Sequence, residues 1–165
     1  ITALTLSGLA TRRFCFEGFL PADKKERTQV LESLKKETRT TILYEAPHHL
    51  KATLKVLYKE LGDRKLTICR ELTKKFETIM PTTLEESLSY YEENEPKGEY
   101  VLVLEGCSKE LIKREEEEAW QQMSVREHYE KYLNSGMDKK TAMKEVAKDR
   151  NVSKREIYNQ LLEGN

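Results

Sequence analysis

The chain has 165 residues, a length that suits one domain with a small addition. Charged residues make up 35% of it and hydrophobic residues 38%, so a densely charged surface should cover a modest core. The 29 basic and 29 acidic side chains cancel, so a nucleic-acid partner would need a local basic patch. The longest apolar run, residues 100–104, is far shorter than the roughly 20 residues of a membrane-spanning helix, which excludes a protein with such helices.

The cysteines indicate a reducing compartment. Cys15, Cys69 and Cys107 are an odd number at wide spacing with no Cys-x-x-Cys pair, so we expect buried free thiols. No signal peptide is visible, and together these observations predict a cytoplasmic protein. The chain begins without a methionine at Ile1, inside what reads as the end of a helix, and we interpret it as a fragment.

Strands and helices alternate in the predicted order of the first 106 residues. Hydrophobic periodicity and helix-capping patterns predict a helix end at 1–6, a strand at 13–16, a helix at 23–37, a strand at 40–44, a helix at 48–61, a strand at 66–69, a helix at 83–94 and a strand at 99–104. The last strand, EYVLVL, is the most apolar and fits the centre of a sheet. The fold class is therefore α/β, with a sheet of about four to five strands and flanking helices.

The composition changes after Gly106, and no further strand pattern follows. Residues 107–122, which carry the run KREEEE, are predicted to form a linker or solvated helix. Residues 123–165 should form an all-helical extension whose three helices are opened by Ser124, Asp138 and Ser153. The last two helices resemble a helix-turn-helix.

Four polar clusters each follow a predicted strand, at residues 17–21, 44–49, 70–74 and 105–106. If these strands are parallel, all four clusters meet at one sheet edge, where open α/β sheets bind ligands. Ordinary polar loops produce the same pattern, so a shared site and unrelated loops both remain open. The segment RELTKKFE, residues 70–77, concentrates two acids and three bases and suits an anionic or polar substrate.

Several kinds of site are not supported by the residues. There is no Gly-rich phosphate loop and no Ser or Cys nucleophile elbow. His48 and His49 open a helix without a second His cluster, so capping or surface roles are expected and no metal site is predicted. Glu45 and Glu71 also fit loop carboxylates tied to nearby Arg or Lys.

The helical extension carries a local positive charge. Residues 138–155 hold seven basic residues against three acidic ones. Such a basic helix-turn-helix suggests contact with nucleic-acid phosphates, although a solvated pair of helices fits the same charges.

Four motifs in a fixed order carry a resemblance to a known family: LSGLATRRFCFEGFLP, ILYEAPHHL, CRELTKKFET and GEYVLVLEG. Together they resemble the tetrapyrrole methylase-like family, and within it the branch that methylates small-subunit ribosomal RNA. The match covers residues 1–106, and the closing helices resemble the helical extension of that branch. His49 departs from the family, which more often carries Arg after Pro-His.

The resemblance implies a two-domain enzyme that uses S-adenosylmethionine to methylate the 2′-hydroxyl of a cytidine in 16S ribosomal RNA of the small subunit. This chain would supply the second domain and the extension, while the first domain with its Gly-rich cofactor segment would be missing. The fragment alone is then expected to be inactive. The family also implies that the catalytic domains pair as a homodimer.

The resemblance, with the strand positions, also implies site residues. The expected cofactor-binding residues are Tyr44, Glu45, Arg70, Glu71, Leu72, Glu99, Tyr100 and Val101. Candidates for proton removal or alkoxide stabilisation are Glu71, Lys74 and Glu77. The expected RNA-binding residues are Arg12, Arg13, Lys24, Lys25, Lys139, Lys140, Lys154, Arg155 and Tyr158. Tyr158 either stacks on a base or packs against Leu161 or Leu162, and packing is the more common case.

Two other interpretations remain. The chain could be an α/β ligand-sensing module with a DNA-binding helix-turn-helix and no enzymatic activity. Residues 152–162 argue against it, because they offer Lys and Arg suited to phosphates rather than successive base-reading side chains. The chain could also serve as a dimerisation domain.

Overall fold

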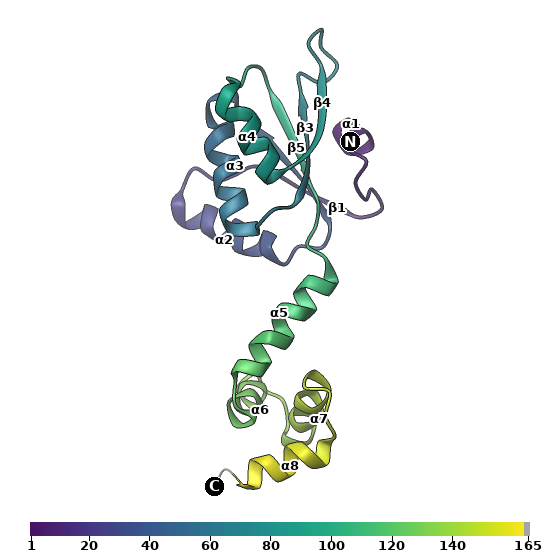
Figure 1. Ribbon diagram of the computed structural model, residues 1–165, viewed down its shortest axis with the longest axis vertical. Coiled ribbons are helices and arrows are strands. Elements are labelled where there is room, and N and C mark those ends of the chain that lie inside the picture. Colours follow the sequence, from purple (N-terminus) through teal and green to yellow (C-terminus); the bar gives the residue numbers. More distant parts are fainter. Residues whose placement is uncertain (164–165) are drawn as a thin grey trace. The chain divides into compact units, whose positions relative to one another are not determined.

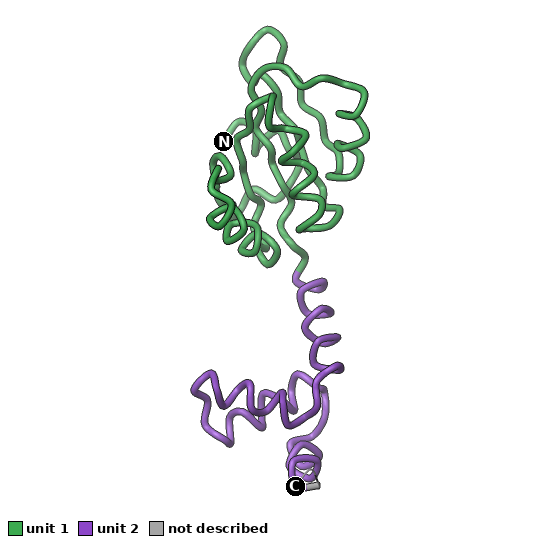
Figure 2. Tube along the Cα trace, turned by 90° about the vertical axis from the view of Figure 1, so that its left-hand side faces the viewer, with its two compact units in different colours: residues 1–108 green, residues 109–165 purple. Residues whose placement is uncertain are grey.

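A computed structural model describes residues 1–163 of the chain. The chain divides into two compact units, residues 1–108 and a second unit that begins at Lys109 (Figure 2). The segment predicted as a linker or solvated helix, residues 107–122, is mostly helical and is grouped with the second unit from Lys109 onward. Among the described residues, no helix has the length and apolarity needed to cross a membrane.

The first unit confirms the predicted α/β fold. Its elements are α1 (Thr2–Leu6), β1 (Phe14–Phe19), α2 (Lys24–Lys35), β2 (Thr40–Glu45), α3 (Pro47–Leu61), β3 (Lys65–Arg70), β4 (Thr78–Thr83), α4 (Leu84–Glu93) and β5 (Tyr100–Leu104). The five strands form one sheet in the order β1-β2-β5-β3-β4. The most apolar strand, β5, lies at its centre as expected, with Leu102 and Val103 fully buried.

Strand direction corrects one part of the prediction. Only β1 and β2 pair in parallel, whereas β5 is antiparallel to both of its neighbours. The carboxyl ends of β1, β2 and β3 therefore share one edge of the sheet, which we call the upper edge, with the beginning of β5. The cluster at Glu105 and Gly106 lies at the opposite edge, so the four polar clusters do not all meet.

Two strand boundaries also differ from the prediction. The sequence predicts no strand between residue 69 and the helix at 83–94, but Thr78–Thr83 form β4, an edge strand in which the missing N–H group of Pro81 is tolerated. Strand β1 continues to Phe19 because a bulge lies between Phe16 and Gly18, which has a φ of 73°. The residues predicted as a loop, 17–21, thus begin inside the strand.

Helices cover the two faces of the sheet unequally. Figure 1 shows α2, α3 and α4 together on one face, where leucines dominate the larger core. The other face carries only the short helix α1, whose Ala3 and Leu4 pack against Ile42, Cys69 and Val103. Much of that second face is therefore left without a helical cover.

Side-chain caps open the helices where the sequence predicts them. Asp23 accepts a hydrogen bond from the Glu26 amide at 2.9 Å, and Thr83 and Ser124 each form a full capping box. Such caps satisfy backbone N–H groups that have no partner within the helix. His48 and His49 are exposed in the first turn of α3, and no metal-binding group of three or more ligands occurs within residues 1–163.

The second unit is all-helical, as predicted. It contains α5 (Lys109–Gln122), α6 (Val125–Asn134), α7 (Lys139–Asp149) and α8 (Lys154–Glu163). Its small core is built on Val146, Ala147 and Ile157, and α6, α7 and α8 contact one another. Burying so few apolar residues leaves the unit dependent on specific polar contacts as well.

Candidate functional site

A groove of about 880 Å³ lies on the thinly covered face of the first unit, at the upper edge of the sheet. Helix α1 borders it on one side, and the end of β2 and the start of β5 form its inner end. The residues that line it are Ile1, Thr2, Ala3, Phe14, Phe16, Phe19, Ile42, Tyr44, Glu45, Ala46, Pro47, Leu72, Thr73, Glu99, Tyr100 and Val101.

Aromatic side chains dominate one wall of the groove. The Phe16 and Phe19 rings lie 5.0 and 5.7 Å from the Tyr44 ring, both edge to face. Phe16 is 57% exposed and Phe19 62% exposed, which is unusual for aromatic residues in a sheet. Exposed aromatic side chains in mutual contact make this wall a candidate binding surface.

The bulge in β1 creates this wall. In a regular strand, residues three apart point to opposite faces, so Phe16 and Phe19 would be separated. Here Phe16 pairs with Ile42, Gly18 with Leu43 and Phe19 with Tyr44. The bulge between Phe16 and Gly18 adds one residue to β1, and this extra residue brings Phe16 and Phe19 to the same face of the sheet. The sequence prediction named neither phenylalanine as a site residue, because it placed Phe16 at the end of a strand and Phe19 in the loop that follows, so that nothing brought them together.

Most of the predicted cofactor-binding residues meet at the groove, but two do not. Those that line it are Tyr44, Glu45, Leu72, Glu99, Tyr100 and Val101. Arg70 instead lines a separate cavity beside α4, and Glu71 lines neither. The alternation of side chains explains this, since Arg70 and Cys69 project from opposite faces of β3.

Glu45 is buried, and its carboxylate is hydrogen-bonded within the chain. Its carboxylate accepts hydrogen bonds from the Thr53 hydroxyl at 2.5 Å and from the Ala46 amide at 2.8 Å. Both donors belong to the chain that leaves β2 and enters α3. Glu45 therefore holds the inner end of the groove in place.

The loop between β3 and β4, residues 71–77, is tightly folded. Glu71 and Thr73 have positive φ angles of 51° and 65°, and the Lys74 amide donates to the Glu71 carbonyl at 2.9 Å. The Glu77 carboxylate accepts from the Thr73 amide at 2.6 Å, which closes the turn. Leu72 and Thr73 are thereby held at the mouth of the groove.

A carboxylate and an ammonium group connect this loop to β5. The Glu71 carboxylate accepts from the Glu99 amide at 2.8 Å, and the Lys74 ammonium contacts the carboxylates of Glu99 at 2.7 Å and Glu71 at 3.3 Å. The bond from Glu99, followed by Lys74, lowers the pKa of Glu71. The same carboxylates, Glu99 first, raise the pKa of Lys74. Both groups are thus charged near neutral pH, which makes Glu71 a weak base and Lys74 a stable cation.

The predicted RNA-binding residues of the first unit do not form one patch. Arg12 and Arg13 precede β1, whereas Lys24 and Lys25 follow it at the start of α2. A strand of six residues spans about 20 Å, so the two pairs lie near opposite edges of the sheet. All four side chains are exposed.

In the second unit, a row of lysines connects the predicted pairs. Lys139 and Lys140 open α7, and Lys154 and Arg155 open α8. The eleven residues of α7 extend about 16 Å, so the pairs are far apart by themselves. Exposed side chains at i, i+4 spacing bridge this length, at Lys140, Lys144 and Lys148.

Tyr158 lies on the surface of α8. It is 52% exposed and is absent from the residues that pack on the helical core, whereas Leu161 is among them. Tyr158 is thus not one of the buried residues of that core, and its packing against Leu161 or Leu162 stays a prediction. Its exposed ring is available for stacking.

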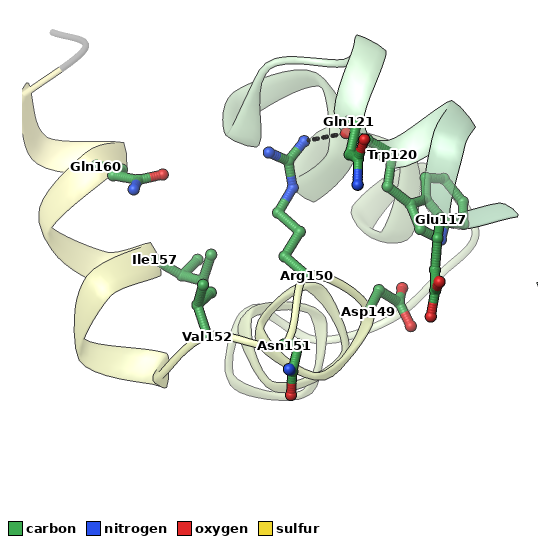
Figure 3. A pocket seen from close by; sticks show the side chains of 9 residues that line it. All are labelled: Glu117, Trp120, Gln121, Asp149, Arg150, Asn151, Val152, Ile157 and Gln160. Atoms are coloured by element: carbon green, nitrogen blue, oxygen red, sulfur yellow. Dashed lines mark hydrogen bonds between the residues drawn. The ribbon is translucent and has the colours of Figure 1, made fainter. Parts of the chain in front are cut away.

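A second pocket, of about 410 Å³, lies within the helical unit (Figure 3). Figure 3 shows the Arg150 guanidinium between Gln121 of α5 and Gln160 of α8. Its Nε donates to His128 Nδ1 at 3.2 Å, and its Nη2 donates to the carbonyl oxygens of Trp120 and Met123. Arg150 thus ties the end of α7 to α5 and α6.

Comparison with known proteins places these features in context. No protein-family model matches the chain. The protein named "Ribosomal RNA small subunit methyltransferase I" of Bacillus subtilis is 45% identical over 158 residues, which cover 96% of this chain and 54% of that protein. The predicted resemblance is confirmed.

Two further proteins with the same name support this result. The one from Halalkalibacterium halodurans is 46% identical and covers 96% of this chain and 54% of its own length. The one from Synechocystis is 41% identical and covers 99% of this chain and 57% of its own length. The chain therefore spans little more than half the length of these ribosomal RNA methyltransferase I relatives.

The similarity to methyltransferase I proteins extends beyond the sheet. Because it covers nearly the whole chain, it includes the helical unit as well as the groove and the loop. His49, where the family more often carries Arg, lies exposed at the start of α3 and does not line the groove.

Proposed function

We propose that this chain is part of an S-adenosylmethionine-dependent methyltransferase that acts on the 2′-hydroxyl of a cytidine in small-subunit ribosomal RNA. The observation that carries the proposal is the aromatic groove at the upper edge of the sheet, in a chain similar to methyltransferase I proteins. Binding beyond the carboxyl ends of strands is the usual arrangement in α/β folds.

The chemistry of the groove fits the cofactor. Exposed aromatic rings accept the flat face of an adenine, and they also attract a positively charged sulfonium group. Phe16, Phe19 and Tyr44 provide such rings, and Glu99 adds a carboxylate at the rim. When bound, the cofactor supplies an electrophilic methyl group.

The residues of the chain then act mainly by positioning. The groove wall holds the donor, and the folded loop of residues 71–77 holds Leu72 and Thr73 beside it. Lys74 does not itself line the groove, but its ammonium contacts the carboxylate of Glu99, which does, and it is the cation we assign to stabilising the alkoxide that develops on the ribose. Glu71 and Glu77 are engaged with backbone N–H groups, so they support the loop in addition to any contact with the hydroxyl proton.

The substrate partner is small-subunit ribosomal RNA within the small ribosomal subunit, in the cytoplasm. The exposed lysine row of α7, the pairs at the start of α7 and α8, and Tyr158 suit a single-stranded or structured RNA. The proposal further includes a preceding methyltransferase domain that closes the cofactor cleft and a homodimer of the complete enzyme.

Methyl transfer tests the proposal. The complete protein is incubated with immature small ribosomal subunits and methyl-labelled S-adenosylmethionine, and label in the RNA is located by digestion to nucleosides. We expect 2′-O-methylcytidine. Replacing Tyr44 by Ala should raise the KM for the cofactor by about tenfold, because an aromatic contact worth over 1 kcal/mol is lost.

Leu6→Ala is the matched control. Leu6 is 44% exposed on α1 but does not line the groove, so its removal should leave the cofactor KM unchanged. Methylation at a base atom, or no label in the RNA, would contradict the proposed reaction. Preferential binding of duplex DNA with no methyl transfer would favour the ligand-sensing alternative.

A further inference from the structure

A third cavity, of about 300 Å³, lies at the upper edge of the sheet on the side covered by α4. It is separate from the aromatic groove, since Tyr100 alone borders both. The side chains that give it its chemistry are Arg70, Tyr90, Tyr91, Asn94, Lys97 and Tyr100.

Within residues 1–163, one nitrogen of the arginine in this cavity lacks a hydrogen-bond partner. Arg70 Nε is buried without a hydrogen-bond acceptor, and no ion pair involves Arg70 among residues 1–163. A buried donor left unsatisfied costs about 1–3 kcal/mol, and more when it is charged. Native structures rarely keep such a group without a ligand or water that satisfies it.

The backbone keeps this arginine in the cavity. Arg70 is the last residue of β3, and it is paired with Thr78 on one side and Tyr100 on the other. The alternation of β3 directs its side chain to the face covered by α4. The Lys97 amide donates to the Tyr100 hydroxyl at 3.0 Å, which holds a second cationic residue at the rim.

Nearby carboxylates make no ion pair with Arg70 among the described residues, although the Glu99 amide, helped by the charge of Arg70, lowers the pKa of Glu71. Glu95 borders the cavity, but its carboxylate contacts Lys51 at 2.7 Å. The Glu71 carboxylate, which follows Arg70 in sequence, contacts Lys74 and the Glu99 amide instead. Glu93, the remaining acid at the rim, makes no ion pair with Arg70 within the described part of the chain.

Three tyrosines line the same cavity as the arginine. The Tyr90 and Tyr91 rings lie 5.0 Å apart and edge to face, and the Tyr91 and Tyr100 rings lie 6.2 Å apart in the same manner. Tyr91 and Tyr100 are buried, whereas Tyr90 is 48% exposed at the mouth. An exposed tyrosine and a guanidinium in one cavity suit a nucleotide, with the base on the ring and the phosphate on the cation.

We propose that this cavity is a phosphate-binding site, and that the phosphate belongs to an RNA strand. The inference rests on the proposed action on ribosomal RNA and adds an RNA contact on the side of the sheet opposite the cofactor groove. A phosphate oxygen supplies the acceptor that Arg70 Nε lacks, and Lys97 adds a second positive charge.

An NMR titration tests whether phosphate binds at Arg70. In the 165-residue chain, the Nε–H signal of Arg70 is observed by NMR while inorganic phosphate, and separately a short single-stranded RNA, is added. We expect the signal to shift with both probes. A shift with inorganic phosphate alone would assign the site to a free phosphate compound instead of RNA, and an unmoved signal with both would overturn the proposal.

Three variants separate a specific contact from a general charge effect. Arg70→Gln should weaken RNA binding by about tenfold. It should also lower the salt slope, which is the slope of log affinity against log salt concentration, by about 1. Arg70→Lys should keep the salt slope but recover only part of the affinity, because an ammonium group lacks the planar pair of donors. Lys59→Gln removes one charge from an 80% exposed side chain on α3 and should change neither quantity.

Equal effects of Arg70→Gln and Lys59→Gln would overturn the proposal. Thermal unfolding of each variant shows whether the fold is kept, and the NMR titration of the unmodified chain does not depend on any variant folding. Neither measurement involves methyl transfer. A failed phosphate site therefore leaves the methyltransferase proposal standing, and failed methyl transfer leaves these titrations interpretable.

Discussion

Two glycines are required by close packing at the ends of β5. Gly98 has a φ of 84°, and a Cβ atom there would lie 2.6 Å from the Glu71 side chain. A Cβ atom on Gly106 would lie 2.3 Å from backbone atoms of Thr38. A contact with backbone cannot relax by side-chain rotation, so Gly106 is the more restrictive of the two.

Gly106→Ala should lower the free energy of unfolding of the first unit by about 3 kcal/mol, the upper end of overpacking costs. Gly62→Ala is the comparison, because Gly62 has a φ of 72° but nothing within 4 Å of its Cβ position. Its φ of 72° with a ψ of −170° is nearly confined to glycine, so backbone strain alone should cost about 1–2 kcal/mol, less than the clash at Gly106. Urea denaturation measures both, and an equal or smaller effect at Gly106 would contradict the packing argument.

His128 makes the second unit sensitive to acid. It is fully buried, its Nδ1 accepts from Arg150 Nε, and its Nε2 lies 3.3 Å from the Asp149 carboxylate. Burial, and next Arg150, lower the pKa of His128 below the ordinary value of 6.5. As the pH falls, the unfolded chain therefore binds a proton on His128 at a higher pH than the folded chain does. The free energy of unfolding falls as the pH drops below about 6.5.

Trp120 reports this transition, because it is the single tryptophan of the chain and stacks on His128 with ring centroids 4.0 Å apart. Thermal unfolding followed by its fluorescence should show a lower midpoint at pH 5 than at pH 7. His128→Gln keeps an acceptor for Arg150 but does not titrate, so it should flatten this dependence. His49→Gln, at an exposed position, should not.

At the scale of elements, the loop between β3 and β4 joins the sheet edge to the groove. Its two positive φ angles at Glu71 and Thr73 are held by bonds to Glu99 and Glu77. Strain of this kind is kept where surrounding contacts over-determine it, and it is common at functional sites. The loop therefore depends on the Glu71 carboxylate for its shape.

Glu71→Ala in the complete enzyme should cut methyl transfer by at least about tenfold. Glu71→Gln separates two explanations, because an amide oxygen still accepts from the Glu99 amide but cannot take a proton. If Glu71 positions the loop, the Gln variant should recover most of the activity. Loss of activity in both variants would identify Glu71 as the base, whereas normal turnover in both would remove it from the mechanism.

At the scale of the whole molecule, each of the two units carries one or more of the proposed binding sites. The groove and the Arg70 cavity belong to the first unit, and the lysine row of α7 belongs to the second. A deletion of the second unit should begin at residue 109 and not at residue 123, because Trp120 of α5 packs on His128 of α6. A cut between them would expose both rings.

Deletion of residues 109–165 should therefore leave the first unit folded while weakening RNA binding. The exposed cations of α7 and α8 account for much of the local positive charge, so the dependence of affinity on salt should also become shallower. Fluorescence anisotropy with a labelled RNA at several salt concentrations measures both effects. An unchanged salt slope would show that the helical unit does not contact RNA phosphates.

The order of elements, the helix caps and the central place of β5 could be predicted from the sequence, because they depend on local periodicity and on hydrogen bonds between near neighbours. The family resemblance could also be read there, since its motifs are short and ordered. Glu105 and Gly106 show the limit of such reasoning. The strand that they follow, β5, is present as predicted, but its direction in the sheet depends on pairing with strands far away in the chain.

Only the tertiary structure decided which side chains share a face. The bulge at Gly18 brings Phe16, Phe19 and Tyr44 onto one wall, and the pleat of β3 places Arg70 on the side opposite the groove. Both results follow from register, which is set by pairing between strands rather than by the residues of one strand. A shift of one residue would have reversed each of them, so the sequence determined the elements and the pairing determined the sites.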